Sequence, residues 1–117
     1  MAETAKGYLS KAQLSNVHVS PRKARLVVDM IRGKSVARAL EQLKFCDKKT
    51  APLLKKLIMS AAANAKDKHS VGVEELYVSR AFVDAGRVLK RSLPRAQGRA
   101  TPLRKRHSTI TVHLDEL

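Results

Sequence analysis

The sequence predicts an α+β fold in which three helices pack on a small antiparallel sheet that carries a long, protruding, basic β-hairpin. Two observations lead to this prediction. Apolar residues follow a helical period through the first half of the chain and a strand-like pattern in short segments near both ends. Between the last two strand-like segments lies a strongly basic stretch, residues 85–106, without an acidic residue. With 117 residues, the chain can form one domain with one modest core.

A short strand and a helix are predicted to begin the fold. In residues 13–20, valines alternate with polar residues, as in a half-buried strand. Ser20 can then act as the N-cap of a helix, and Pro21 suits the first helical position. The apolar residues of this helix recur at i, i+3, i+4 and i+7, and they are Ala24, Val27, Val28 and Ile31. Gly33 can end the helix.

Two more helices are predicted to follow. Ser35 can cap the second helix, and its apolar residues repeat the same spacing at Val36, Ala39, Leu40 and Leu43. The third helix starts at Asp47 or Thr50 and reaches Lys66, and Pro52 near its first turn is compatible with both starts. Its apolar face consists of Leu54, Leu57, Ile58, Ala61, Ala62 and Ala65. The alanines on this face allow another element to approach closely.

The last third of the chain is predicted to form an antiparallel hairpin. Residues 73–84 are rich in Val, Tyr and Phe, which is typical of a strand, and this strand would place Glu74 and Glu75 on opposite faces. Residues 108–114 alternate between apolar and polar side chains. We expect Ile110, Val112 and Leu114 to point inward and Thr109, Thr111 and His113 to point outward.

The composition argues against several classes of function. The single cysteine, Cys46, cannot form an internal disulfide and fits a reducing cytoplasm. The longest uncharged stretch has nine residues, 57–65, whereas a membrane span needs about 20, so we expect no membrane partner. The histidines show no metal-ligand spacing, and no nucleotide-binding or catalytic motif occurs. The chain is therefore predicted to be no enzyme and to hold no cofactor and no metal.

A net charge of +14 points to a polyanionic partner, with nucleic acid favoured over an anionic membrane surface. One cluster of cations, Arg22, Lys23 and Arg25, lies at the start of the first predicted helix. The helix dipole favours anions there, so a bound phosphate would supply the missing negative charge, although a solvated helix face explains this cluster equally well. The second cluster lies within residues 85–106 and comprises Arg87, Lys90, Arg91, Arg95, Arg99, Arg104, Lys105 and Arg106.

The second cluster is more specific, because a free arm with this sequence would repel itself. Phosphates of RNA would neutralise its cations, and the small residues Ala96, Gly98 and Ala100 would allow close approach of the backbone. The stretch contains no aromatic residue, so contact with phosphates and with RNA shape is favoured over base stacking. A free-standing architectural nucleic-acid-binding protein is the alternative, since such proteins also combine helices with a basic β-arm that carries a proline.

Three segments of the sequence carry a family resemblance. They are SPRKARLVVDMIRGK at residues 20–34, SAAANA at 60–65, and VDAGRVLKRSLPRAQGRATPLRKR at 83–106, which is followed by STITVHL. These segments resemble the bacterial large-subunit ribosomal protein twenty-two family over residues 12–114. The pattern KR-x-x-PRA-x-GRA is far more specific than basic composition alone. The chain departs from the family pattern at residues 84–86 and 107–109.

The resemblance implies one ribosomal-protein domain over residues 1–117, with 85–106 as the extended hairpin. It implies a structural constituent of the large subunit in cytoplasmic ribosomes that binds large-subunit ribosomal RNA, assists its assembly and contacts neighbouring ribosomal proteins. In the family, the hairpin tip lines the polypeptide exit tunnel and so meets the nascent polypeptide. The implied tunnel tip consists of Lys90, Arg91, Pro94, Arg95, Ala96, Gly98, Arg99 and Ala100. The resemblance also implies RNA contacts for Arg22, Lys23, Arg25, Arg104, Lys105 and Arg106.

Overall fold

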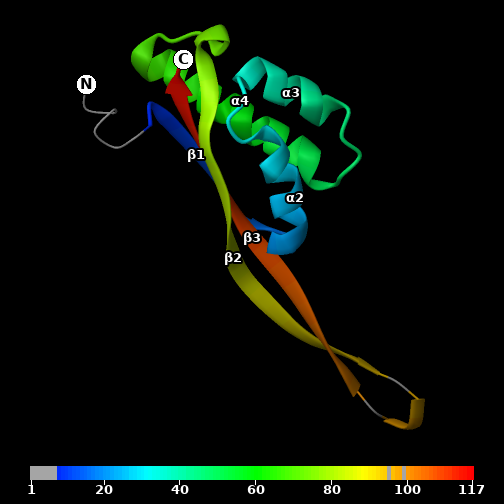
Figure 1. Cartoon of the computed structure of the whole chain (residues 1–117). Helices are drawn as coiled ribbons and strands as arrows, with labels where there is room; N and C mark the ends of the chain where they lie inside the picture. The colour runs from blue at the N-terminus through cyan, green and yellow to red at the C-terminus, as the bar shows by residue number, and fades with distance from the viewer. Residues whose placement is uncertain (1–7, 95, 99) are drawn as a thin grey trace.

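The computed structural model describes residues 8–94, 96–98 and 100–117, and within them it shows three α-helices and a three-stranded sheet (Figure 1). In chain order the elements are β1 (Ser10–Val17), α2 (Pro21–Ile31), α3 (Val36–Lys44), α4 (Thr50–His69), the 3-10 turn η1 (Val73–Glu75), β2 (Leu76–Pro94), the 3-10 turn η2 (Ala96–Gly98) and β3 (Ala100–Glu116). The predicted α+β class is thereby confirmed.

The sheet is antiparallel and has the order β1-β3-β2, so β3 is its central strand. β1 pairs with β3 from Ser10 opposite Leu114 to Val17 opposite Ser108. The pairing of β2 with β3 continues far beyond the end of β1, as far as Pro94 opposite Ala100. Residues 85–106, which we call the arm, therefore leave the rest of the chain, the body, as a two-stranded ribbon (Figure 1). The predicted protruding hairpin is confirmed.

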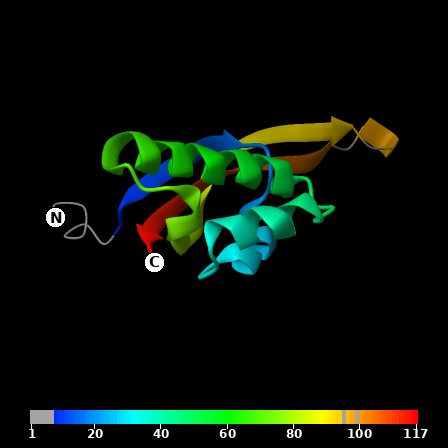
Figure 2. The same ribbon diagram turned by 90° about the horizontal axis from the view of Figure 1, so that it is seen from above.

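The helices lie together on one face of the sheet, while the arm points away from them (Figure 2). α4 packs across β1 and β3, α2 packs on β2 and β3, and α3 packs mainly on α4. The helix faces predicted from the sequence are buried in this layer, including Val28 and Ile31 of α2 and Leu54 and Ile58 of α4. Among the described residues, the buried apolar core is aliphatic and contains no aromatic side chain.

The helix ends follow the local sequence signals. The hydroxyl of Ser20 accepts a hydrogen bond from the amide of Lys23 at 3.4 Å, and Ser35 caps α3 in the same way. α4 begins at Thr50, one of the two starts that the sequence allowed, but its N-cap is Lys49, so neither Asp47 nor Thr50 caps the helix. The helix ends at His69, three residues later than predicted, because polar residues continue it until Ser70 adopts a left-handed conformation with φ 54°.

Three strand predictions are corrected. β1 begins at Ser10 rather than near residue 13, because β3 offers its first residues a partner as far as Leu114. β2 begins at Leu76, since Val73–Glu75 form a 3-10 turn, so the two glutamates of that turn do not alternate across a strand. Thr111 is buried although it was predicted to point outward, because the central strand places it between Gln13 of β1 and Phe82 of β2.

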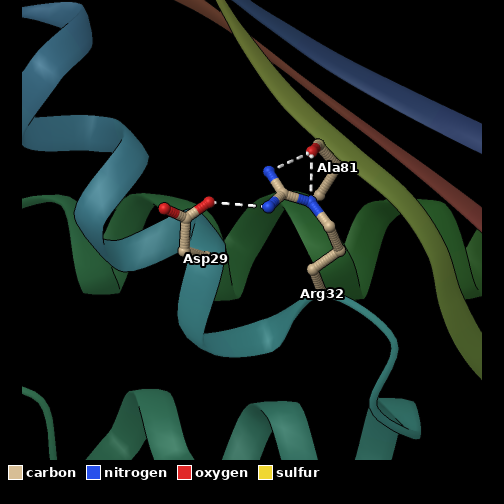
Figure 3. A network of polar contacts seen from close by, with 3 residues as sticks. All are labelled: Asp29, Arg32 and Ala81. Atoms are coloured by element: carbon tan, nitrogen blue, oxygen red, sulfur yellow. Dashed lines mark hydrogen bonds and ion pairs between the residues drawn. The ribbon is translucent and has the colours of Figure 1, made fainter.

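The outer edge of β2 is covered by donors from α2 and the residues after it. Arg32 donates from Nε and Nη2 to the carbonyl of Ala81 at 3.1 and 2.8 Å, and its Nη1 contacts Asp29 at 2.7 Å (Figure 3). Arg25 donates to the carbonyl of Val83 at 3.0 Å. Asp29 thus pairs with Arg32, whereas Arg25 reaches β2. The donors satisfy carbonyls that an edge strand would otherwise leave open to another chain.

Replacing Arg32 with methionine is expected to lower the free energy of unfolding by about 1–2 kcal/mol, because two hydrogen bonds from a charged donor to Ala81 are lost. The measurement is equilibrium unfolding in urea. Arg38→Met is the matched control, since the Arg38 side chain is exposed and contacts no partner among the described residues. An equal loss of stability in both variants would show that the contact with Ala81 does not hold β2.

Candidate nucleic-acid interface

The two faces of the arm both carry cations. Side chains alternate along the paired strands, so one face presents Val88, Lys90, Arg104 and Arg106, and a shallow depression is lined by these four residues. The opposite face presents Leu89, Arg91, Leu103 and Lys105. Every cation of these two sets is exposed. A partner that surrounds the arm would therefore meet positive charge from both sides.

The pairing of β2 with β3 sets like charges against each other. Lys90 lies directly opposite Arg104, and cross-strand pairs of like charge are destabilising. Neither side chain contacts an acidic group within the described part of the chain. The apolar side chains of the arm offer no compensation, because Val88, Leu93 and Leu103 remain 39%, 39% and 37% exposed. Beyond the pairing of its two strands, the described side chains of the arm therefore add little to its stability.

The arm also gives the molecule its elongated shape. The principal extents are 63 × 31 × 19 Å, and the radius of gyration is 17.3 Å. A compact chain of this length would have a radius of gyration of about 13 Å. The arm reaches well beyond the body, as the sequence predicted, and exposes its surface to whatever surrounds it (Figure 1).

The tip of the arm reverses the chain through two consecutive left-handed residues, Gln97 with φ 64° and Gly98 with φ 71°. No heavy atom lies within 4 Å of a Cβ built on Gly98, so the backbone conformation, and not crowding within the protein, favours glycine there. Pro94, Ala96 and Gly98 are exposed. Two of the predicted tip residues, Arg95 and Arg99, lie outside the described residues, and for Ala100 only the backbone is described.

The predicted cluster on α2 is divided by the structure. Arg22 and Lys23 are exposed and have no acidic partner among the described residues, and the first turn of α2 contains no acidic residue. Arg25 uses one guanidinium nitrogen to hold the carbonyl of Val83. Arg22 and Lys23 therefore remain available to an anion, while Arg25 also has a structural role.

A hollow at the base of the arm brings together cations that are far apart in the sequence. It is lined by His18, Val19, Ser20, Lys23, Leu26, Lys48, Lys49, Thr50, Arg104 and Arg106, and we call it the basic hollow. Three predicted residues, Lys23, Arg104 and Arg106, thus meet at one place. Lys48 and Lys49 were not selected from the sequence. The sequence feature that could have indicated them is a pair of lysines directly before a helix that has no acidic residue in its first turn.

The base of the arm is closely packed beside this hollow. The rings of His18 and His107 stack with centroids 4.8 Å apart, and Nδ1 of His107 lies 3.2 Å from the carbonyl oxygen of Arg87. The pairing of β2 with β3 is irregular between Ala85 and Val88. Within this irregularity a Cβ on Gly86 would lie only 3.2 Å from the carbonyl carbon and oxygen of His107. The rings and backbone are therefore closely packed at the point where the arm leaves the body.

The sheet face opposite the helices carries a small ring cluster. His113 lies against Tyr8 and Phe82, with ring centroids 4.3 and 5.6 Å away. Burial, and then the nearby cations Arg80 and Lys11, lower the pKa of His113 below its ordinary value. His113 is therefore neutral near pH 7 and adds no positive charge to this face.

Two further kinds of feature, a metal site and a membrane-spanning helix, are absent from the described residues. Their histidines, Cys46 and carboxylates form no group of three that could hold a metal ion. None of the described helices is long and apolar enough to cross a bilayer.

Comparison with known proteins gives consistent matches over this whole architecture. The sequence matches the family model described as "Ribosomal protein L22p/L17e" over residues 12–115. It is 52% identical over 107 residues to the large ribosomal subunit protein uL22 of Citrifermentans bemidjiense, with 92% of this chain and 96% of that protein covered. It is 49% identical over 108 residues to the uL22 of Lactobacillus delbrueckii subsp. bulgaricus, with 92% of each chain covered. The matched residues include the arm and the basic hollow.

Proposed function

The chain belongs to the ribosomal protein L22p/L17e family of the large ribosomal subunit, and we propose that it binds the RNA of that subunit through its arm and the base of the arm. The resemblance predicted from the sequence is confirmed. The relatives are structural ribosomal proteins, so the prediction that the chain is no enzyme is confirmed as well. As a large-subunit protein it is a component of the cytoplasmic ribosome.

The arm is the observation that carries the proposal of RNA binding. It is a two-stranded ribbon with exposed cations on both faces, a like-charge pair across its strands, and no acidic residue between positions 85 and 114. Such a ribbon is unfavourable in water and favourable among phosphates, because each neutralised phosphate releases condensed counterions. The absence of aromatic side chains from the arm fits contacts with backbone and shape.

The tip of the arm is proposed to line the polypeptide exit tunnel and to meet the nascent chain. Support comes from the exposure of Lys90, Arg91 and Pro94 and from the distance between the tip and the body (Figure 1). Because Val88, Leu93 and Leu103 of the arm are exposed and not buried against the body, the RNA that forms around the arm would order it, which fits a role in subunit assembly. Exposed apolar side chains on the helices, such as Phe45 at 76% and Met59 at 54%, fit contacts with neighbouring ribosomal proteins.

The alternative, a free-standing architectural nucleic-acid-binding protein, is separated from this proposal by a sedimentation experiment. We propose that residues 1–117 act as one domain whose place is in the large subunit. The protein should therefore remain with large subunits in a sucrose gradient after a high-salt wash. Recovery mainly with the bulk DNA of the cell, and not with subunits, would favour the alternative.

Binding to protein-free large-subunit RNA is expected to depend strongly on salt. If six to ten phosphates are neutralised, log affinity should fall against log salt with a slope between about −4 and −9, at about 0.7–0.9 per phosphate. Filter binding of the full chain between low and moderate salt measures this slope. A slope near zero would contradict an electrostatic mode of binding.

A further inference from the structure

We propose that the basic hollow holds the sugar-phosphate backbone of one RNA strand where the arm leaves the body, and that it does not bind free phosphate at millimolar concentration. The inference rests on the proposed RNA-binding function and assigns part of the interface to the junction between the arm and the body. Its components come from three separate segments: the start of α2, the residues that precede α4, and the β3 side of the arm.

The first argument is the uncompensated charge of the hollow. Its lining contains five cationic side chains and no carboxylate. None of the five has an ion-pair or hydrogen-bond partner for its side chain in the described part of the chain. The members are Lys23, Lys48, Lys49, Arg104 and Arg106. Like charges that converge on one concave site raise the local concentration of anions and favour a bound one.

The second argument is the position of two helix ends. α2 and α4 both begin at the hollow, and the first turn of each lacks an acidic residue. Lys23, Lys48 and Lys49 instead place positive charge at or beside these positive helix ends, which is unfavourable without a ligand. The N-cap of α4, Lys49, provides no side-chain hydrogen bond, in contrast to the serines that cap α2 and α3. A phosphate would supply both the negative charge and the missing acceptors.

The third argument is the remainder of the lining, which suits a nucleotide better than a free ion. Leu26 is 58% exposed at the hollow although it is a large apolar residue, and His18 and the buried Val19 also line the hollow. Free phosphate has no apolar part to cover such a surface, whereas the ribose and base of an RNA strand do. Arg104 and Arg106 also belong to the cationic face of the arm, so a strand held in the hollow can continue along the arm.

The experiment removes two positive charges at the hollow and, in a control variant, two positive charges at the far end of α4. The RNA affinities of the two variants are then compared. Lys48→Gln/Lys49→Gln is the test variant, and Lys66→Gln/Lys68→Gln is the matched control, since these lysines are exposed in the last turn of α4. With protein-free large-subunit RNA as the probe, the test variant should bind about thirty- to sixtyfold more weakly at 0.1 M salt. Its salt slope should shrink by about 1.4–1.8, which corresponds to two phosphates.

A third variant and a second probe separate the remaining explanations. Lys48→Arg/Lys49→Arg keeps both charges and should retain the affinity, which would show that the positive charges determine binding. Urea unfolding of the glutamine variant should match that of the unchanged protein, which excludes a general folding defect. Inorganic phosphate alone should not shift the amide resonances of Lys23 and Thr50 at millimolar concentration. Saturable shifts with phosphate, together with unchanged RNA affinity of the glutamine variant, would assign a free-phosphate site and overturn the inference.

Failure of this inference can be told apart from failure of the proposed function. Equal, small losses in the test and control variants would mean that the hollow acts only through net charge, while strong, salt-dependent binding by the unchanged protein would leave the RNA-binding function intact. Absence of salt-dependent RNA binding by the unchanged protein would remove both proposals.

Discussion

Reversing the three cations of the returning arm strand to glutamate, at Arg104, Lys105 and Arg106, is expected to weaken binding of large-subunit RNA by about a thousandfold at 0.1 M salt. Loss of three phosphate contacts accounts for roughly a hundred- to fivehundredfold, and repulsion between the new carboxylates and the phosphates adds to it. The arm presents these cations on both of its faces, so a surrounding RNA cannot avoid them. Filter binding with protein-free large-subunit RNA measures the loss.

The same triple substitution is expected to stabilise the arm of the free protein. Lys90 lies opposite position 104, so a repulsive cross-strand pair becomes an attractive one, and such pairs contribute about 0.2–1 kcal/mol each. Amide hydrogen exchange of β2 between Lys90 and Leu93 should therefore slow in the triple variant. Opposite signs of the two effects would show that the arm's charge serves RNA binding at the expense of its own stability. Faster exchange throughout the body would instead show that the variant is misfolded.

A control with the same change in net charge completes this test. Lys44→Glu/Lys66→Glu/Lys68→Glu also lowers the charge by six units, from +14 to +8, but at the last turns of α3 and α4. It should cost a few tenths of a kcal/mol per site at these helix ends and reduce RNA affinity only modestly. An equal loss of affinity in both triple variants would mean that the overall field, and not the arm, determines binding.

Much of the fold could be predicted because its signals are local. The caps at Ser20 and Ser35 and the proline at the start of α2 each act within one helical turn, and the structure confirms them. The buried helix faces follow a period that the sequence displays directly. The arm could be predicted for a related reason: a run of cations without carboxylates cannot form a core, so it must leave the body.

The features that escaped prediction depend on contacts between distant parts of the chain. Lys48 and Lys49 join Arg104 and Arg106 in the basic hollow although more than 50 residues separate the two pairs. No local pattern could show that the start of α4 lies beside the base of the arm. Arg25 and Arg32 posed the same difficulty, because their partners are carbonyls of β2 that become edge groups only when the order β1-β3-β2 is known.

Deleting residues 92–99 is expected to leave the body of the protein intact, with an unchanged free energy of unfolding. None of the described side chains in this segment is buried. The register also allows a clean closure, since Arg91 pairs with Leu103 and the three residues that remain between them can form a short hairpin loop. Urea unfolding of the free protein measures this. A collapse of stability would show that the tip contributes to the core.

Hydrogen exchange and ribosome assembly test the stability of the free arm and the proposed role of its tip. In the unshortened free protein, amides from about Lys90 to Thr101 should exchange quickly, because an isolated two-stranded ribbon is only marginally stable in water, while β2 near Val78 and β3 near Val112 stay protected. The shortened protein should still enter large subunits, since the basic hollow and the base of the arm remain. Passage of nascent chains through those subunits should change, if the tip lines the tunnel as proposed.

A length-matched variant separates the reach of the tip from its chemistry. Replacing residues 92–99 with glycine and serine keeps the length but removes Arg95, Arg99 and the proline at position 94. This variant should be incorporated into subunits like the deletion. If the cations of the tip anchor it in RNA, its effect on the passage of nascent chains should differ from that of the deletion, because a flexible, uncharged loop would remain in the tunnel. Failure of both variants to enter subunits would instead place the essential RNA contact in the tip itself, and the base of the arm would then be insufficient for assembly.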